Sequence, residues 1–89
     1  MNSNPIELPK IDLTTFSLSV SSAVFIHLGI SESNSKVDLP LARQNIELLE
    51  MIFEKTSGNR TPDEDRLIGQ LLFETRMRFV ETQKKEAHK

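Results

Sequence analysis

Three segments of the chain carry apolar residues at the spacing of an amphipathic α-helix. The first lies within an uncharged run over residues 13–30, the second extends over about residues 38–57, and the third over about residues 62–84. Gly29 is expected to end the first helix, and the serine-rich stretch that follows it is expected to be a loop. The pattern therefore predicts an all-α protein of three helices in a single helical domain over residues 12–84.

The two ends of the chain lie outside this pattern. Residues 1–11 contain Pro5 and Pro9 and show little helical periodicity. We expect them to form a flexible N-terminal arm, since chain ends that are not tied to the core are usually poorly ordered. Residues 85–89 follow the last periodic position, and we expect them to form a flexible C-terminal tail.

The strongest local signal lies between the second and third helices. Gly58 can adopt the left-handed conformation that closes a helix, and Asn59 is the next most tolerant residue for it. Thr61 can then accept a hydrogen bond at the start of a new helix, and Glu64, three residues later, completes a capping box. The sequence therefore predicts a tight turn and a hairpin of the second and third helices.

Helices one and three carry more apolar residues than one face can hold. In the first helix, the main stripe is predicted to consist of Leu13, Phe16, Val20, Ala23, Val24 and His27. The spare faces consist of Leu18, Phe25 and Leu28 on the first helix and of Phe73, Met77 and Val80 on the third. A helix that is apolar nearly all round is normally buried on more than one side. We therefore expect the spare faces to form an interaction surface that assembles the chain into a homo-oligomeric helical bundle.

Composition supports association and excludes stabilisation by cysteine cross-links. The chain has 89 residues and no cysteine, so no disulfide or thiolate metal site can stabilise it. A single core of this size is marginal, and oligomerisation is one of the usual remedies. The absence of cysteine and of a recognisable signal peptide fits a cytoplasmic protein.

Charge argues against a nucleic-acid partner. The formal net charge is −2, with both signs mixed along the chain. A DNA-binding helix-turn-helix presents the N-terminal end of its second helix to the groove. Here that end would carry Asp63, Glu64 and Asp65, which phosphates would repel. We expect no nucleic-acid binding.

The uncharged run also permits a membrane interpretation. Its 18 residues reach the lower limit for a transmembrane helix. However, four serines dilute it, His27 lies inside it, and no aromatic belt or basic cluster flanks it. A buried or interfacial helix is the simpler interpretation, and a peripheral membrane protein that uses this helix stays open as an alternative.

His27 is the one candidate for metal or acid–base chemistry within the helical part. The positions one turn away hold Ala23, Val24, Ile30 and Ser31, none of them a customary metal ligand. A ligand- or metal-binding module with His27 at an oligomer interface is a second alternative. A histidine in the core or interface that bonds to the backbone is the simpler account.

No known catalytic motif is present. The chain lacks a nucleophile elbow, a glycine-rich phosphate loop and a zinc-protease or paired-cysteine signature. We therefore assign no catalytic, cofactor-binding or metal-binding residue, and we expect no cofactor and no enzymatic activity.

The approach to the turn carries a family resemblance. Its residues are Leu39-x-x-Ala42, Ile46-Glu47-x-Leu49-x-Met51 and Glu54-Lys55-Thr56-x-Gly58-Asn59-x-Thr61. Phe16 and the Leu28-Gly29 pair fit the start of the same pattern, and Arg76-x-x-Phe79-Val80 fits its end. Over about residues 13–82 the chain resembles a bacterial family catalogued as domain of unknown function 1844. In that family an Asp is commoner where Glu47 stands, and a Leu where Arg60 stands.

The resemblance implies a small, all-helical, bacterial cytosolic protein, and it transfers no activity, cofactor or catalytic residue. Arg60 lies in the predicted turn, so its departure from the family pattern leaves the expected fold unchanged. Together with the spare apolar faces, these observations predict a small non-enzymatic, self-associating helical interaction or scaffolding protein that could also bind another protein.

Overall fold

The computed structural model describes residues 11–30 and 36–88 of the chain. The predictions made for nearly all of the N-terminal arm and for the middle of the first loop therefore lie outside the described residues. Within the described part, three helices and no strand are present. The predicted all-α class with three packed helices is confirmed.

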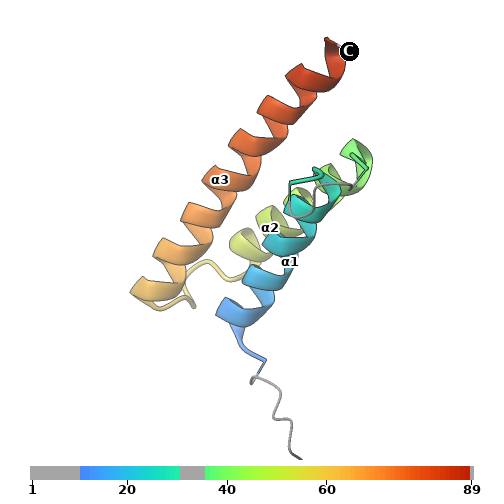
Figure 1. The fold of residues 1–89 in the computed structure, drawn as a ribbon. Coiled ribbons are helices and arrows are strands. Elements are labelled where there is room, and N and C mark those ends of the chain that lie inside the picture. The colour runs from blue at the N-terminus through green and yellow to red at the C-terminus, as the bar shows by residue number, and fades with distance from the viewer. Residues whose placement is uncertain (1–10, 31–35, 89) are drawn as a thin grey trace, which may run out of the picture.

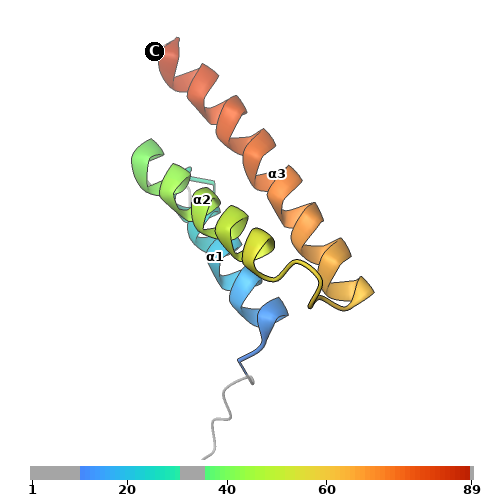
Figure 2. The ribbon, with the colours of Figure 1, turned by 180° about the vertical axis from the view of Figure 1, so that it is seen from behind.

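The helices are α1 (Leu13–His27), α2 (Leu39–Lys55) and α3 (Pro62–Ala87). Figures 1 and 2 show that α2 runs back along α1 and that α3 then returns in the direction of α1. The second and third helices thus form the predicted hairpin. At 26 residues, α3 is the longest helix, and at 1.5 Å per residue it is roughly 39 Å long.

Local hydrogen bonds explain where the helices begin and end. Asp12 Oδ1 accepts a hydrogen bond from the N–H of Thr15 (2.8 Å), and Asp38 Oδ1 accepts one from the N–H of Leu41 (3.1 Å). Each aspartate therefore satisfies one of the free amides that every helix leaves at its start. Gly29 follows α1 with a φ of 74°, a conformation that glycine adopts without strain.

Two clusters of buried apolar side chains form the core. The first consists of Val20, Leu49, Ile68 and Leu72, and thus joins all three helices. The second consists of Val24, Leu28, Ala42 and Ile46, and lies between α1 and α2. From α3, the partly buried Phe79 packs against this second cluster. Most of the buried apolar side chains of α3 therefore lie in its first half, near the turn.

The buried face of α1 overlaps the predicted stripe at Val20 and Val24 but is rotated away from Phe16. Val20, Val24 and Leu28 recur every four residues on the buried face, so Ser17 and Ser21 on the same face are also buried. Phe16, placed in the main stripe by the sequence, is 42% exposed. The helix is apolar on nearly every side, so its own periodicity could not select the buried face.

The C-terminal boundary also needs correction. Helix α3 continues to Ala87, so residues 85–87 are helical rather than part of a flexible tail. The stretch that extends it, residues 85–87, consists of good helix formers. His88 follows as the C-terminal capping residue, and its N–H donates to the carbonyl of Lys85 (3.2 Å).

Candidate interaction surface on helix α3

The predicted stripe on α3 is exposed to solvent. The exposed fraction is 64% for Phe73, 41% for Met77 and 46% for Val80. These positions are separated by four and three residues, so they lie on one side of the helix. The core side of α3 is formed instead by Ile68 and Leu72. The chain therefore leaves a line of three large apolar side chains uncovered.

A shallow hollow accompanies this stripe. It is lined by Gly69, Phe73, Arg76, Met77 and Val80. Gly69 lies at the end nearer the start of α3, and a Cβ atom at this position would meet no atom within 4 Å apart from its chain neighbours and the backbone of its own helix. We call these five residues the α3 face. It combines an aromatic side chain, two aliphatic ones and a notch where a side chain is missing.

An ion pair borders the α3 face on the side of α2. Glu50 Oε2 accepts hydrogen bonds from Nη2 (2.8 Å) and Nε (3.1 Å) of Arg76. Both side chains are about half exposed, so water screens the pair and it adds little to stability. Its geometric effect is to fix Arg76 toward α2. A second groove, between α2 and α3, shares Arg76 and Val80 with the α3 face.

The predicted surface on α1 is only partly available. Leu18 is 47% exposed and Phe25 is half buried. Leu28 is 3% exposed and belongs to the second core cluster, so its assignment to an interaction surface is wrong. Its place in the sequence, four residues after Val24, sets it on the buried side. Ile26, which the sequence did not single out, is 49% exposed.

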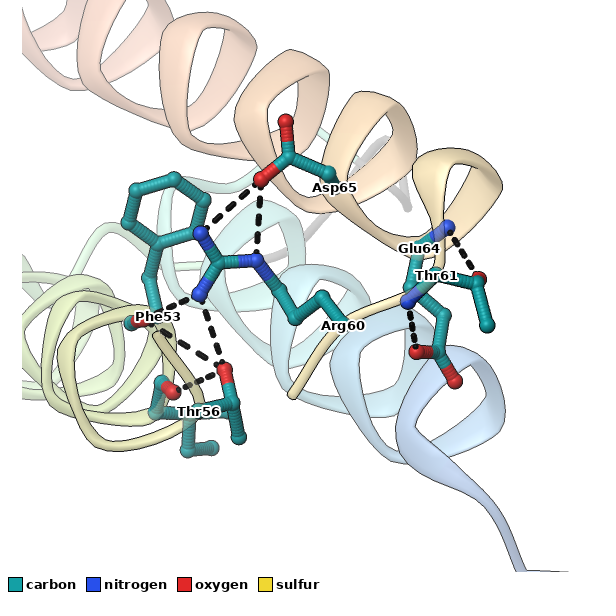
Figure 3. A network of polar contacts seen from close by, with 7 residues as sticks. Phe53, Thr56, Arg60, Thr61, Glu64 and Asp65 are labelled. Carbon is teal, nitrogen blue, oxygen red and sulfur yellow. Dashed lines mark hydrogen bonds and ion pairs between the residues drawn. The ribbon is translucent and has the colours of Figure 1, made fainter. Parts of the chain in front are cut away.

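The turn between α2 and α3 has the predicted geometry. Gly58 has a φ of 82°, and the N–H of Asn59 donates to the carbonyl of Thr56 (2.9 Å). Thr61 Oγ1 accepts from the N–H of Glu64 (3.1 Å), while Glu64 Oε1 accepts from the N–H of Thr61 (2.8 Å). Figure 3 shows this capping box beside the turn. These four residues therefore act in folding, and they set the direction in which α3 leaves α2.

The role of Arg60, the central residue of the turn, was not predicted from the sequence. Its side chain is only 10% exposed and carries hydrogen bonds from three of its nitrogen atoms. Nε and Nη2 donate to Asp65 Oδ1 (3.0 and 2.8 Å), while Nη1 donates to the carbonyl of Phe53 and to Thr56 Oγ1 (3.0 Å). Figure 3 shows the guanidinium between the end of α2 and the start of α3.

Thr56 completes this network. Its hydroxyl donates to the carbonyl of Ile52 (2.7 Å) and accepts from Arg60, so its hydrogen-bond donor and acceptor are both satisfied. The sequence did contain one signal for this role of Arg60, namely an arginine that follows a helix end and precedes an acidic first turn. Phe53, whose carbonyl accepts from Arg60, lies seven residues before it, and only the folded turn brings the two together.

The described residues contain no group of three or more His, Asp or Glu side chains that could hold a metal ion. His27 is half buried in the last turn of α1, and its backbone carbonyl accepts from the N–H of Asp38 (2.7 Å). Among the described helices, none is both long enough and apolar enough to cross a membrane.

A three-helix fold with a capped turn between its last two helices thus characterises this protein. The model of the family described as Domain of unknown function (DUF1844) matches residues 10–81. The match covers most of the 89 residues, so the chain belongs to this family. No curated protein and no solved structure matches the chain.

Proposed function

We propose that this protein is a non-enzymatic helical interaction module that self-associates through the α3 face. The observation that carries the proposal is Phe73, which is 64% exposed in the middle of that face. Large aromatic side chains of this kind contribute little on an isolated surface and dominate affinity when they pack at an interface. Met77 and Val80 extend the same contact on the side toward the C-terminus.

The small size of the core favours association with a second copy. Among the described residues, the two clusters together contain eight buried apolar residues. A chain of this length without a disulfide has little stability to spare. Burial of the α3 face against another copy would remove further apolar area from water. Each Å² of apolar area buried stabilises the assembly by about 25 cal/mol. Leu18 and Ile26 on α1 offer a second exposed apolar region for larger assemblies.

The test is the mass of the protein in solution. One chain has a mass of 10.1 kDa, and we expect light scattering at micromolar concentration to give at least twice that value. The Phe73→Glu variant should shift the mass to that of one chain, because a carboxylate would be buried at the interface. Far-UV circular dichroism should show that its helix content is kept.

The matched control is Met51→Glu. Met51 is 48% exposed on α2 and is not one of the residues of the α3 face, so this variant should keep the mass of the wild type. A wild-type protein that stays at 10.1 kDa across micromolar concentrations would overturn the proposal. An oligomer that Phe73→Glu leaves intact would show that the interface lies elsewhere.

A further inference from the structure

Gly69 is a glycine that the isolated chain does not explain. It lies inside α3, where glycine is less favourable than alanine because it loses more conformational freedom on folding. Its φ is not in the left-handed region, and a Cβ atom at this position would have no neighbour within 4 Å. Neither a turn nor close packing within the chain therefore requires a glycine here. A glycine in this position does leave room for another backbone to approach the helix closely.

The order of residues on the α3 face suits an antiparallel partner. The notch at Gly69 and the protruding side chain of Val80 lie eleven positions apart, or roughly 16 Å along the helix. Consider the α3 helix of a second copy that lies antiparallel, with the midpoint between Gly69 and Val80 at the same level in both helices. Each Val80 then meets the Gly69 of the other copy. In the same arrangement Phe73 lies level with Arg76 of the other copy and about 1.5 Å along the axis from the level of Met77, within reach of a favourable sulfur–aromatic contact. A parallel arrangement would set the two notches against each other and leave a gap.

The charges at the ends of α3 select the same orientation. The first turn holds Asp63, Glu64 and Asp65, and the last turn holds Lys84 and Lys85. Opposite charges meet in an antiparallel pair, whereas like charges meet in a parallel one. Asp63 and Asp65 already pair with Arg66 and Arg60 of the same chain. These charges therefore determine orientation more than affinity.

We propose that two copies of this chain pair through antiparallel α3 helices, with Gly69 of each copy receiving Val80 of the other. This inference rests on the proposed function, and it adds the partner surface, the orientation and the residue that sets the distance between the helices. Gly69 allows the two backbones to approach closely enough for Phe73 to be covered.

Single introduced cysteines test the orientation, because the natural chain has none. The variants are Gly69→Cys and Val80→Cys, each oxidised alone and as an equal mixture, with covalent dimers resolved by mass spectrometry. A disulfide forms only where the two Cα atoms lie within about 7 Å. We expect the mixture to give the crosslinked mixed dimer and each variant alone to give at least tenfold less crosslinked product.

The open space around Gly69 makes the cysteine there compatible with the fold of the single chain. The control pair is Leu41→Cys and Met51→Cys, which lie on α2 with 41% and 48% exposed. It reports the crosslinking that random collisions produce, and we expect it to give no more mixed dimer than either control variant gives alone.

The possible results separate this inference from the proposed function. Crosslinking of Gly69→Cys with itself would show a parallel pair and overturn the orientation. No crosslink above the control pair, in a protein that light scattering shows to be oligomeric, would overturn the α3 pairing and leave self-association standing. A strict monomer by light scattering would overturn both.

Discussion

The guanidinium of Arg60 lies over the aromatic ring of Phe53, with Cζ 3.9 Å from the ring centroid. This cation–π contact is reinforced because the same guanidinium donates to the backbone carbonyl of Phe53. Arg60 also pairs with Asp65 in the first turn of α3 (2.8 Å). One side chain thus caps the end of α2 and holds the start of α3.

Replacement of Arg60 by Ala should lower the free energy of unfolding by about 2 kcal/mol. The change removes hydrogen bonds to a charged group that is largely buried, together with the contact on Phe53. Urea denaturation followed by circular dichroism at one fixed protein concentration measures the effect. The control is Arg66→Ala, whose exposed pair with Asp63 should contribute less than about 0.5 kcal/mol. Equal losses for the two variants would contradict the assigned role of Arg60.

The same substitution at two glycines should act with opposite signs. Gly58→Ala should destabilise the protein by about 1 kcal/mol, because a φ of 82° strains any residue that has a Cβ atom. Gly69→Ala should stabilise the isolated chain by a similar amount, about 1 kcal/mol, because alanine is the better helix former and meets no neighbour. Thermal unfolding at low protein concentration compares the two variants. A loss of stability for both would show that Gly69 also has a role within the single chain.

The rotational setting of α1 can be tested with one pair of variants. Leu28→Ala should cost about 3 kcal/mol, because Leu28 is 3% exposed and its truncation leaves a cavity. Ile26→Ala should cost less than about 1 kcal/mol, because Ile26 is 49% exposed. Urea unfolding of both variants decides the point. The opposite order would mean that α1 buries the face that carries Ile26.

Replacement of Ser17 by Ala should stabilise the protein. Its hydroxyl is fully buried and has no hydrogen-bond partner among the described residues. Ser17→Ala removes this unsatisfied group and should raise the free energy of unfolding by about 1 kcal/mol more than Ser19→Ala does. Ser19 is exposed on the same helix, so that variant accounts for the better helix propensity of alanine. If both variants gain equally, the hydroxyl of Ser17 is satisfied in solution.

The helix starts and the turn were accessible from the sequence because they depend on neighbours three or four residues apart. The hydroxyl of Thr61 and the carboxylate of Glu64 meet whenever the chain begins a helix there, whatever lies around them. The same holds for the cap at Asp38, and for the left-handed backbone at Gly29 and Gly58. The exposed stripe on α3 was also predictable, since Ile68 and Leu72 already define a separate inner face.

Only the tertiary structure decided which face of α1 is buried and what Arg60 does. An evenly apolar helix has no preferred direction of its own, so α2 and α3 selected the side with Ser17, Val24 and Leu28. Arg60 gained its role because the turn brings Phe53 and Asp65 to the same guanidinium. The sequence by itself determined the three helices and the turn through local hydrogen bonds. The contacts between them depend on packing across the chain, which local spacing does not record.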